Sequence, residues 1–230
     1  CLLRLSALGD ATHVVPVVRT LQRHLPEAQL TWVIGHGEAK LLAGLEGVRF
    51  VVYDKRSGLA GMRALWRQLR GERFDVLLQM QLAARANLLA MGLRARRRIG
   101  YDRARSKEGH GLVVNERIPA GGQHVLDVLG RFCEPLGIHQ EQVEWRLPVG
   151  GQDRQWAAGH LSRDRPWLLV SPCSSHRLRN WSAQRYAAVA DHAASRGWGV
   201  VICGGRSALE RETTDAILAC RLIDRPLRPT

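Results

Sequence analysis

Short apolar runs alternate along the chain with segments whose apolar residues recur every three or four positions. The first pattern is typical of buried parallel strands, and the second is typical of amphipathic helices. Strands are predicted at residues 2–5, 29–34, 48–53, 74–79 and 97–101. Helices are predicted between them, at residues 12–25, 38–45, 61–70 and 83–93. Strands separated by helices of this length indicate βαβ units and a parallel sheet.

Two further elements and one proline complete the first part of the chain. Pro16 lies inside the first helical segment, so that helix either starts late or kinks there. Residues 109–118 predict one more strand, and residues 124–136 predict a helix that ends before Gly137. We therefore expect a first α/β domain over residues 1–145.

The alternation of predicted strands and helices stops in residues 138–151, where Pro148 and two glycines mark a linker. It resumes after this linker. A helix, a strand, a second helix, a second strand and a third helix are predicted at residues 152–162, 167–171, 182–196, 199–203 and 208–220. This pattern predicts the start of a second α/β domain, which covers residues 146–230. Two strands are too few for a stable doubly wound sheet, so we expect this second domain to be incomplete, or truncated, within these residues.

The composition is that of an ordinary globular protein, with 45% hydrophobic and 24% charged residues among 230. No stretch approaches the ~20 apolar residues of a membrane span. No charged leader precedes the first apolar run, so we expect a cytoplasmic protein. The five cysteines are scattered, without a C-x-x-C pair, which predicts reduced and mostly buried thiols rather than a disulfide or zinc framework.

A net charge of +13 and an isoelectric point near 10.8 call for a partner hypothesis. The basic residues are densest over residues 94–107, as Arg94, Arg96, Arg97, Arg98, Arg103, Arg105 and Lys107. Nucleic acid, an anionic membrane surface and a phosphorylated small molecule would all fit such a cluster. A general bias of the proteome toward arginine would also produce it, so charge alone does not decide between these alternatives.

The first predicted strand opens into a loop of small residues that carries a single carboxylate, Asp10. Ligands of α/β sheets bind where strands end and helices begin, so Asp10 is a candidate for chemistry. The alternative is that Asp10 only caps the helix that follows, because Asp is a preferred N-cap residue.

A second polar loop, residues 171–181, follows the first strand of the second domain. It contains Ser174, Ser175, Arg177 and Arg179, and a helix is predicted to begin directly after it. Hydroxyls, guanidinium groups and backbone N–H groups at a helix start together favour a phosphate site. A solvated polar loop without a ligand is the alternative.

A third candidate is the turn at Gly204 and Gly205, since glycine lets a ligand approach the backbone closely. The turn lacks the G-x-G-x-x-G fingerprint of dinucleotide sites, and the chain has no Walker A sequence, H-E-x-x-H or G-x-S-x-G. It also has no D-x-D pair, and its histidines lack metal-ligand spacing, so no metal site is expected.

Two of these loops carry a resemblance to a known family. Residues 4–10, read as Arg-Leu-Ser-Ala-Leu-Gly-Asp and followed by Thr12, His13 and Pro16, resemble the start of the ADP-heptose:lipopolysaccharide heptosyltransferases, glycosyltransferase family nine. Residues 173–181 resemble that family's second-domain loop, in which a hydroxyl pair precedes Lys-x-Trp. Here Arg179 stands where lysine is usual, and it keeps the charge. Residues 100–102, His124 and residues 203–205 also fall where the family has comparable features.

The resemblance implies a GT-B fold, in which two Rossmann-like domains bind the acceptor and the nucleotide sugar respectively. The second domain would be truncated here, because the family's Asp-Ser/Thr-Gly…His motif does not occur in these residues. The implied activity is the inverting transfer of heptose from ADP-heptose onto the lipopolysaccharide inner core, with no metal or cofactor. Asp10 would then be the general base. The residues implied to hold the donor diphosphate are Ser174, Ser175, Arg179 and Gly205.

The implied acceptor is an anionic lipopolysaccharide core, met by a peripheral protein at the inner-membrane face. The candidate acceptor-binding residues are Ser6, His13, Gln81, Arg85, Arg103 and Lys107. One alternative is a GT-B glycosyltransferase that uses another nucleotide sugar in cell-envelope polysaccharide synthesis. The other is a nucleic-acid-binding module, for which we expect aromatic residues among the basic ones. Only Tyr101 meets that expectation.

Overall fold

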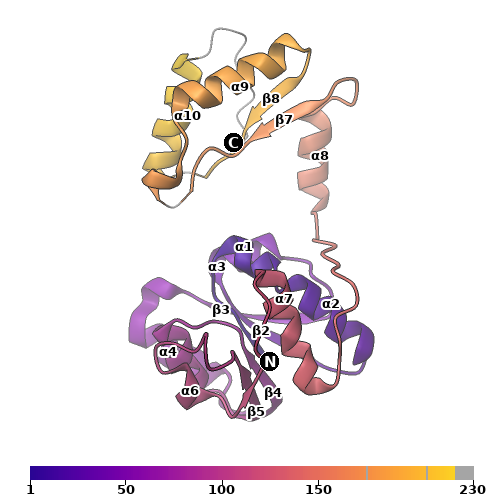
Figure 1. The fold of residues 1–230 in the computed structure, drawn as a ribbon, viewed down its shortest axis with the longest axis vertical. Helices are drawn as coiled ribbons and strands as arrows, with labels where there is room; N and C mark the ends of the chain where they lie inside the picture. Colours follow the sequence, from indigo (N-terminus) through magenta and orange to yellow (C-terminus); the bar gives the residue numbers. More distant parts are fainter. Residues whose placement is uncertain (175, 206, 221–230) are drawn as a thin grey trace. The chain divides into compact units, whose positions relative to one another are not determined.

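The computed structural model of the protein describes residues 1–174, 176–205 and 207–220. The chain divides into two compact units, Cys1–Val149 and Gly150–Thr230 (Figure 1). Strands and helices alternate in both units, and all strand pairings among these residues are parallel. The predicted α/β class is therefore confirmed.

The first unit is built on a six-stranded sheet with the order β3-β2-β1-β4-β5-β6. Its strands are β1 (Leu2–Leu3), β2 (Leu30–Gly35), β3 (Val48–Tyr53), β4 (Phe74–Gln79), β5 (Ala95–Gly100) and β6 (Glu116–Arg117). This is the order of a doubly wound sheet, in which the winding direction reverses between two neighbouring central strands. Here the reversal falls between β1 and β4, which pair directly through Leu2 and Leu78.

Helices cover both faces of this sheet. They are α1 (Leu8–Thr12), α2 (Val15–His24), α3 (His36–Leu41), α4 (Gly58–Gln68), α5 (Ala84–Met91), α6 (His110–Val113) and α7 (Val125–Gly130), with 3₁₀ turns at η1 (Lys55–Ser57) and η2 (Arg131–Leu136). Helices α2 and α7 lie on one side, and α4 and α6 lie on the other (Figure 1). Because successive strand residues point to opposite faces, Leu2 and Trp32 join the core under α2, and Leu3 and Val33 join the core under α4.

The structure corrects the first predicted helix, residues 12–25. The loop before it already contains the short helix α1, and α2 starts only at Val15. Pro16 lies in the first turn of α2, where its missing N–H would have no partner in any case. The proline therefore delays the helix rather than bending it.

Two later elements also differ from the prediction. Of the strand predicted at 109–118, only Glu116–Arg117 pairs as a strand, because Gly109 has a positive φ of 75° and α6 begins directly after it. The helix predicted at 124–136 changes from α-helix to 3₁₀ at Arg131. Pro135 lacks an N–H group and cannot continue the α-helical hydrogen bonds, which accounts for the change.

The second unit contains two paired strands, β7 (Trp167–Val170) and β8 (Gly199–Ile202). Its helices are α8 (Gly151–His160), α9 (Ala183–Ser195) and α10 (Ala208–Cys220), with a 3₁₀ turn at η3 (Arg177–Arg179). Small residues let α9 pack closely on the strands, as Ala190 and Ala193 do against Val170. Gly199 is required for the same reason, since a Cβ there would lie 2.3 Å from the Trp167 ring.

The cysteines only partly match the prediction. All five lie within the described residues and form no disulfide. Only Cys133 is buried, so the expectation of mostly buried thiols is wrong. Burial raises the pKa of the Cys133 thiol to about 12, which keeps it protonated and unreactive at neutral pH. None of the described helices is long and apolar enough to cross a bilayer.

Candidate active site

Asp10 lies in α1, in the loop that leaves the carboxyl end of β1. The chain returns from β1 through α2 on one face of the sheet and from β4 through α5 on the other. Loops that diverge in this way open a crevice at the carboxyl edge, which is where open α/β sheets bind their ligands. Asp10 is therefore at the position in this unit where the topology favours a site.

The Asp10 carboxylate is held from two directions. Its Oδ2 atom accepts a hydrogen bond from the Ala7 N–H at 3.2 Å, which helps cap α1, and lies 2.6 Å from Nη2 of Arg4. The Arg4 side chain is 12% exposed, whereas that of Asp10 is 42% exposed. The two interpretations of Asp10 from sequence, a helix cap and a candidate for chemistry, are thus compatible, because Asp10 supports its own helix while remaining open to solvent.

Arg4 is fixed in turn by groups from two other strand ends. Its Nη1 donates to the Met80 carbonyl at 2.5 Å and to the Tyr101 hydroxyl oxygen at 3.5 Å. The Tyr101 hydroxyl donates to the same carbonyl at 3.0 Å, and burial raises its pKa. Trp32 donates from its indole N–H to the Arg4 carbonyl at 3.1 Å. The ends of β1, β4 and β5 therefore form one platform under Asp10.

Sequence reasoning missed the roles of Arg4 and Tyr101 in this platform. A usable signal was present for Arg4, because a charged residue inside an apolar run, directly after a buried strand, needs a partner. The resemblance included residues 100–102, but nothing in the sequence linked Tyr101 to Arg4, since the two residues are 97 positions apart in the chain.

A buried network of hydrogen-bonded polar side chains supports this platform through Tyr101. The Tyr101 N–H donates to Nε2 of His110 at 3.0 Å, so the imidazole proton is on Nδ1, which lies 3.0 Å from the Asn87 side-chain oxygen. Gln79 donates to the same oxygen at 2.9 Å. Burial, together with the nearby charge of Arg117, lowers the pKa of His110 to about 4, so this histidine is neutral near pH 7.

Two of the predicted acceptor-binding residues lie next to the Asp10 loop. Gln81 accepts a hydrogen bond from the Leu5 N–H at 2.6 Å and donates to the Ser6 hydroxyl at 3.3 Å. Ser6, Gln81 and Asp10 are therefore grouped at the same edge of the sheet. His13 follows one turn later, with its ring centroid 6.5 Å from that of Trp145.

The other three predicted acceptor residues have no hydrogen bond or ion pair to this group among the described residues. Arg85 donates to the Lys55 carbonyl at 3.1 Å, which ties it to the loop after β3. Arg103 and Lys107 are exposed in the loop after β5. All three are at the carboxyl side of the sheet, and their role in acceptor binding stays a prediction.

Three arginines of the predicted basic cluster form ion pairs or hydrogen bonds with other residues of the same unit. Arg97 pairs with Glu116 at 2.7 Å and donates to the Pro135 carbonyl at 2.6 Å. Arg98 donates to backbone carbonyls of three residues, Ala90, Leu93 and Val113. Arg105 pairs with Asp102 and donates to the Gly122 carbonyl. The charge of these three arginines is therefore used within the unit, where their guanidinium groups bond to carboxylates and to backbone carbonyls of helix ends and loops.

In the second unit, the loop after β7 holds its shape mainly by local bonds. The Ser174 N–H donates to the Asn180 side-chain oxygen at 2.8 Å, and the Ser174 hydroxyl donates to the His176 carbonyl at 2.9 Å. Arg177 pairs with Glu212 of α10 at 2.7 Å. Arg179 is exposed, and its guanidinium group has no hydrogen bond or ion pair within the part of the chain that is described. Ser175 lies outside the described residues.

The glycine turn after β8 already binds a carboxylate of the chain itself. The Gly205 N–H donates to Oε1 of Glu210 at 2.7 Å, and the Ser207 N–H and hydroxyl donate to Oε2 at 3.1 and 2.6 Å. The Ser207 hydroxyl and these backbone donors lower the pKa of Glu210. A phosphate bound at Gly205, as predicted, would have to displace this carboxylate.

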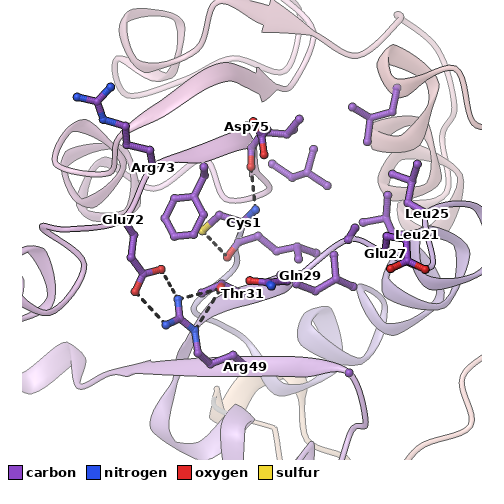
Figure 2. A pocket seen from close by; sticks show the side chains of 18 residues that line it. Cys1, Leu21, Leu25, Glu27, Gln29, Thr31, Arg49, Glu72, Arg73 and Asp75 are labelled. Atoms are coloured by element: carbon purple, nitrogen blue, oxygen red, sulfur yellow. Dashed lines mark hydrogen bonds and ion pairs between the residues drawn. The ribbon is translucent and has the colours of Figure 1, made fainter.

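Each unit has a recess among its described residues. In the first, a pocket of about 1130 Å³ opens beside Cys1, Thr31 and Arg49, where β2 and β4 extend beyond the amino end of the two-residue β1 (Figure 2). It lies at the opposite end of the strands from Asp10, so we do not assign the reaction to it. In the second unit, a recess of about 340 Å³ lies between the Arg179 loop and α10, and its lining includes Arg177, Asn180, Trp181, Leu209, Glu212 and Thr213. The described residues contain no group of three His, Cys, Asp or Glu side chains placed to hold a metal ion.

Comparison with known proteins identifies the family. Residues 62–223 match the family model described as glycosyltransferase family 9 (heptosyltransferase). The chain belongs to glycosyltransferase family 9. This confirms the family that the resemblance predicted, and the matched residues include the Arg179 loop.

Curated relatives of this family 9 chain extend beyond the part that it matches. The chain is 37% identical to the lipopolysaccharide core heptosyltransferase OpsX of Haemophilus influenzae, over 95% of this chain and 63% of the relative. It is 24% identical to lipopolysaccharide heptosyltransferase 1 of Pseudomonas aeruginosa, over 95% of this chain and 64% of the relative. The chain thus spans slightly less than two thirds of the length of these relatives.

Solved family 9 structures share the fold. The glycosyltransferase family 9 protein of Veillonella parvula matches with a TM-score of 0.84 and 18% identity, over 99% of this chain and 68% of that one. Heptosyltransferase WaaC of E. coli, solved with ADP-2-deoxy-2-fluoro heptose, matches with a TM-score of 0.75 and 18% identity, over 94% and 71%. The predicted GT-B-type fold is therefore confirmed.

Proposed function

We propose that the protein is a heptosyltransferase of lipopolysaccharide core assembly, with ADP-heptose as its donor. Membership of family 9 supports glycosyl transfer, and the relative at 37% identity is named for heptose transfer to the lipopolysaccharide core. The ligand of the WaaC structure makes ADP-heptose the first donor to test. The reaction needs no further cofactor, and it takes place at the cytoplasmic face of the inner membrane, where a lipid-linked core is available.

The observation that carries the proposal is the half-exposed Asp10 carboxylate at the reversal point of the sheet. One of its oxygens is engaged by Arg4 and Ala7, and the other has no hydrogen-bond partner among the described residues. A fixed carboxylate of this kind can accept a proton from a sugar hydroxyl. The two oxygens thus divide positioning and chemistry between them.

In the proposed reaction, the acceptor hydroxyl oxygen attacks C1 of the heptose while Asp10 takes the hydroxyl proton. The C1–O bond to the diphosphate breaks, and ADP leaves with the bonding electron pair. A single displacement of this kind inverts the configuration at C1. Charge that develops on the leaving diphosphate would be stabilised by Arg179 and by backbone N–H groups of the same loop.

The first experiment offers the full gene product a panel of nucleotide sugars together with a deacylated lipopolysaccharide core acceptor. We expect transfer from ADP-heptose, release of one ADP per transfer, and a product whose anomeric configuration is inverted in its NMR spectrum. Transfer from a UDP or GDP sugar instead would establish the alternative envelope glycosyltransferase. Release of ADP with retained configuration would exclude the single displacement through Asp10.

A further inference from the structure

We propose that the outer surface of helices α4, α5 and α6 is a docking face for anionic membrane lipid. This assignment rests on the proposed function for its biological purpose, because a lipid-linked acceptor requires the enzyme to work at a membrane. The physical argument for the face is independent, and comes from its continuity, its exposed apolar residues and its charge.

Helices α4 and α6 lie on the same side of the first unit's sheet (Figure 1), and α4, α5 and α6 all bury residues in the same core under them. Trp66 of α4 donates to the Leu89 carbonyl of α5 at 2.9 Å. Asn87 of α5 donates to the carbonyl of Glu108, just before α6, at 3.0 Å. Side chains on the outer side of these helices therefore belong to a single surface.

Large apolar side chains are exposed across this layer. Leu59 of α4 is 64% exposed, Met91 of α5 is 65% exposed, and Leu112 of α6 is 91% exposed. Leu88 of α5 adds a fourth, at 39%. Each helix thus presents at least one apolar side chain that can enter the interfacial region of a bilayer.

The same layer is strongly basic. Residues 55–71 contain no acidic residue and five basic ones, Lys55, Arg56, Arg63, Arg67 and Arg70. Residues 76–101 also contain no acidic residue. Arg63, Arg67, Arg94 and Arg96 are exposed and have no acidic partner within the described ranges. Their charge is therefore available to an outside partner, unlike that of Arg97 and Arg98.

The opposite layer shows that this charge is local. Residues 8–47, which include α1, α2 and α3, mix four acidic residues with three arginines and lysines. A general arginine bias would have given both layers an excess of basic over acidic residues. The asymmetry favours one attractive face instead.

Lipid fits this surface better than nucleic acid. Binding to single-stranded nucleic acid uses exposed aromatic rings, and the aromatic residue of the outer layer, Trp66, is half-buried and hydrogen-bonded. Arginines interspersed with exposed leucine and methionine are typical of interfacial membrane binding. The face also reaches the carboxyl edge of the sheet, because Leu59 and Arg85 lie in the first turns of α4 and α5. Docking there would bring the edge that carries Asp10 close to a lipid-linked acceptor.

The test measures co-sedimentation of the full gene product with vesicles, without substrate. We expect binding to vesicles that contain phosphatidylglycerol, weak binding to pure phosphatidylcholine, and loss of binding as salt rises. Arg63→Gln with Arg67→Gln should weaken binding roughly 30-fold, since a basic residue near an anionic surface contributes about fivefold. The matched control, Arg163→Gln with Arg196→Gln in the second unit, should change it less than about threefold.

A second pair of variants separates the apolar contribution from charge. Leu112→Gln should weaken binding and make the remaining binding more sensitive to salt, whereas Leu41→Gln on α3 should not. Thermal melting confirms that all the variants, which alter exposed side chains, are folded.

The proposal is overturned if both arginine pairs weaken binding equally, if neutral vesicles bind as well as anionic ones, or if duplex DNA but not lipid depends on Arg63 and Arg67. Transfer to a soluble deacylated core is measured alongside. Intact transfer without vesicle binding refutes the docking face alone, and vesicle binding without transfer from any donor refutes the proposed function alone.

Discussion

The two loops that carry the candidate chemistry follow strands in the same way but are held differently. The loop after β1 is anchored by residues far away in sequence, because Arg4 and Leu5 bond to Met80 and Gln81 at the end of β4. The loop after β7 is held chiefly by its own residues, as in the bond from Ser174 to Asn180. One is a fixed platform, and the other is a local turn with an exposed arginine.

This difference matches the different demands of the two proposed roles. A general base has to be held in a defined place relative to the reacting hydroxyl, since misplacement reduces its efficiency. A diphosphate is bound by charge and by several donors, which tolerates adjustment when the ligand arrives. Variants in the first loop should therefore affect turnover, whereas variants in the second should affect donor affinity.

The largest expected effect comes from Asp10→Asn. Asparagine keeps the shape and can still accept the hydrogen bond from Ala7, but it cannot take a proton from the acceptor. We expect kcat to fall about 10²–10⁴-fold, with ADP affinity in calorimetry almost unchanged. An unchanged kcat would remove Asp10 from the reaction, and equal losses in kcat and ADP affinity would remove the contrast between the loops.

The next effect concerns the stability of the platform at low pH. His110 has a pKa of about 4 in the folded unit and about 6.5 when unfolded, so the unfolded chain binds the extra proton first. Stability should therefore fall as pH drops from 6.5 to 4, by up to about 3 kcal/mol, and change little from this group below pH 4. Urea unfolding at several pH values measures this. His110→Gln should be less stable at pH 7 but flatter between pH 6.5 and 4, and a slope equal to that of the parent would refute the assignment.

Arg179→Ala should have a smaller effect, confined to donor binding. Loss of a hydrogen bond to a charged group predicts ADP binding that is weaker by roughly 1.5–3 kcal/mol in calorimetry. Arg179→Lys keeps the charge and is the control, with affinity expected to remain close to that of the parent. Equal ADP affinity for the alanine variant and the parent would show that the diphosphate binds elsewhere.

The smallest effect is expected from Asn180→Ala, which removes the acceptor for the Ser174 N–H. ADP affinity should fall by about 0.5–1.5 kcal/mol, because the loop loses one neutral hydrogen bond while Arg179 remains. A loss larger than that of Arg179→Ala would mean that loop shape, rather than charge, governs donor binding.

Much of the fold could be predicted from the sequence because buried parallel strands are continuous apolar runs. The strands at 48–53 and 74–79 match β3 and β4 at both ends. The stretch 109–118 failed because its apolar residues also suit a helical turn, and a glycine with positive φ together with the buried His110 selects that turn. Local pattern does not contain this information.

The site was predictable only in part for a related reason. Asp10 and Arg179 lie within short loops whose residues are close in sequence and resemble those of a family. The support of Asp10 by Arg4, Met80 and Tyr101 joins three strand ends and depends on the order of the sheet. The internal use of Arg97 and Arg98 was hidden too, because counting charge does not reveal which guanidinium groups meet carbonyls.

The central position of β1 has a consequence for how the protein is made. Leu2 pairs with Trp32 on one side and with Leu78 on the other, and Arg4 donates a hydrogen bond to Tyr101. Contacts between residues so far apart form slowly, and a ribosome adding about 5–20 residues per second needs on the order of ten seconds to pass from Asp10 to Tyr101. During that interval the first loop has been synthesised but lacks its anchors. The carboxylate proposed to take the proton thus leaves the ribosome well before the residues that fix it in place.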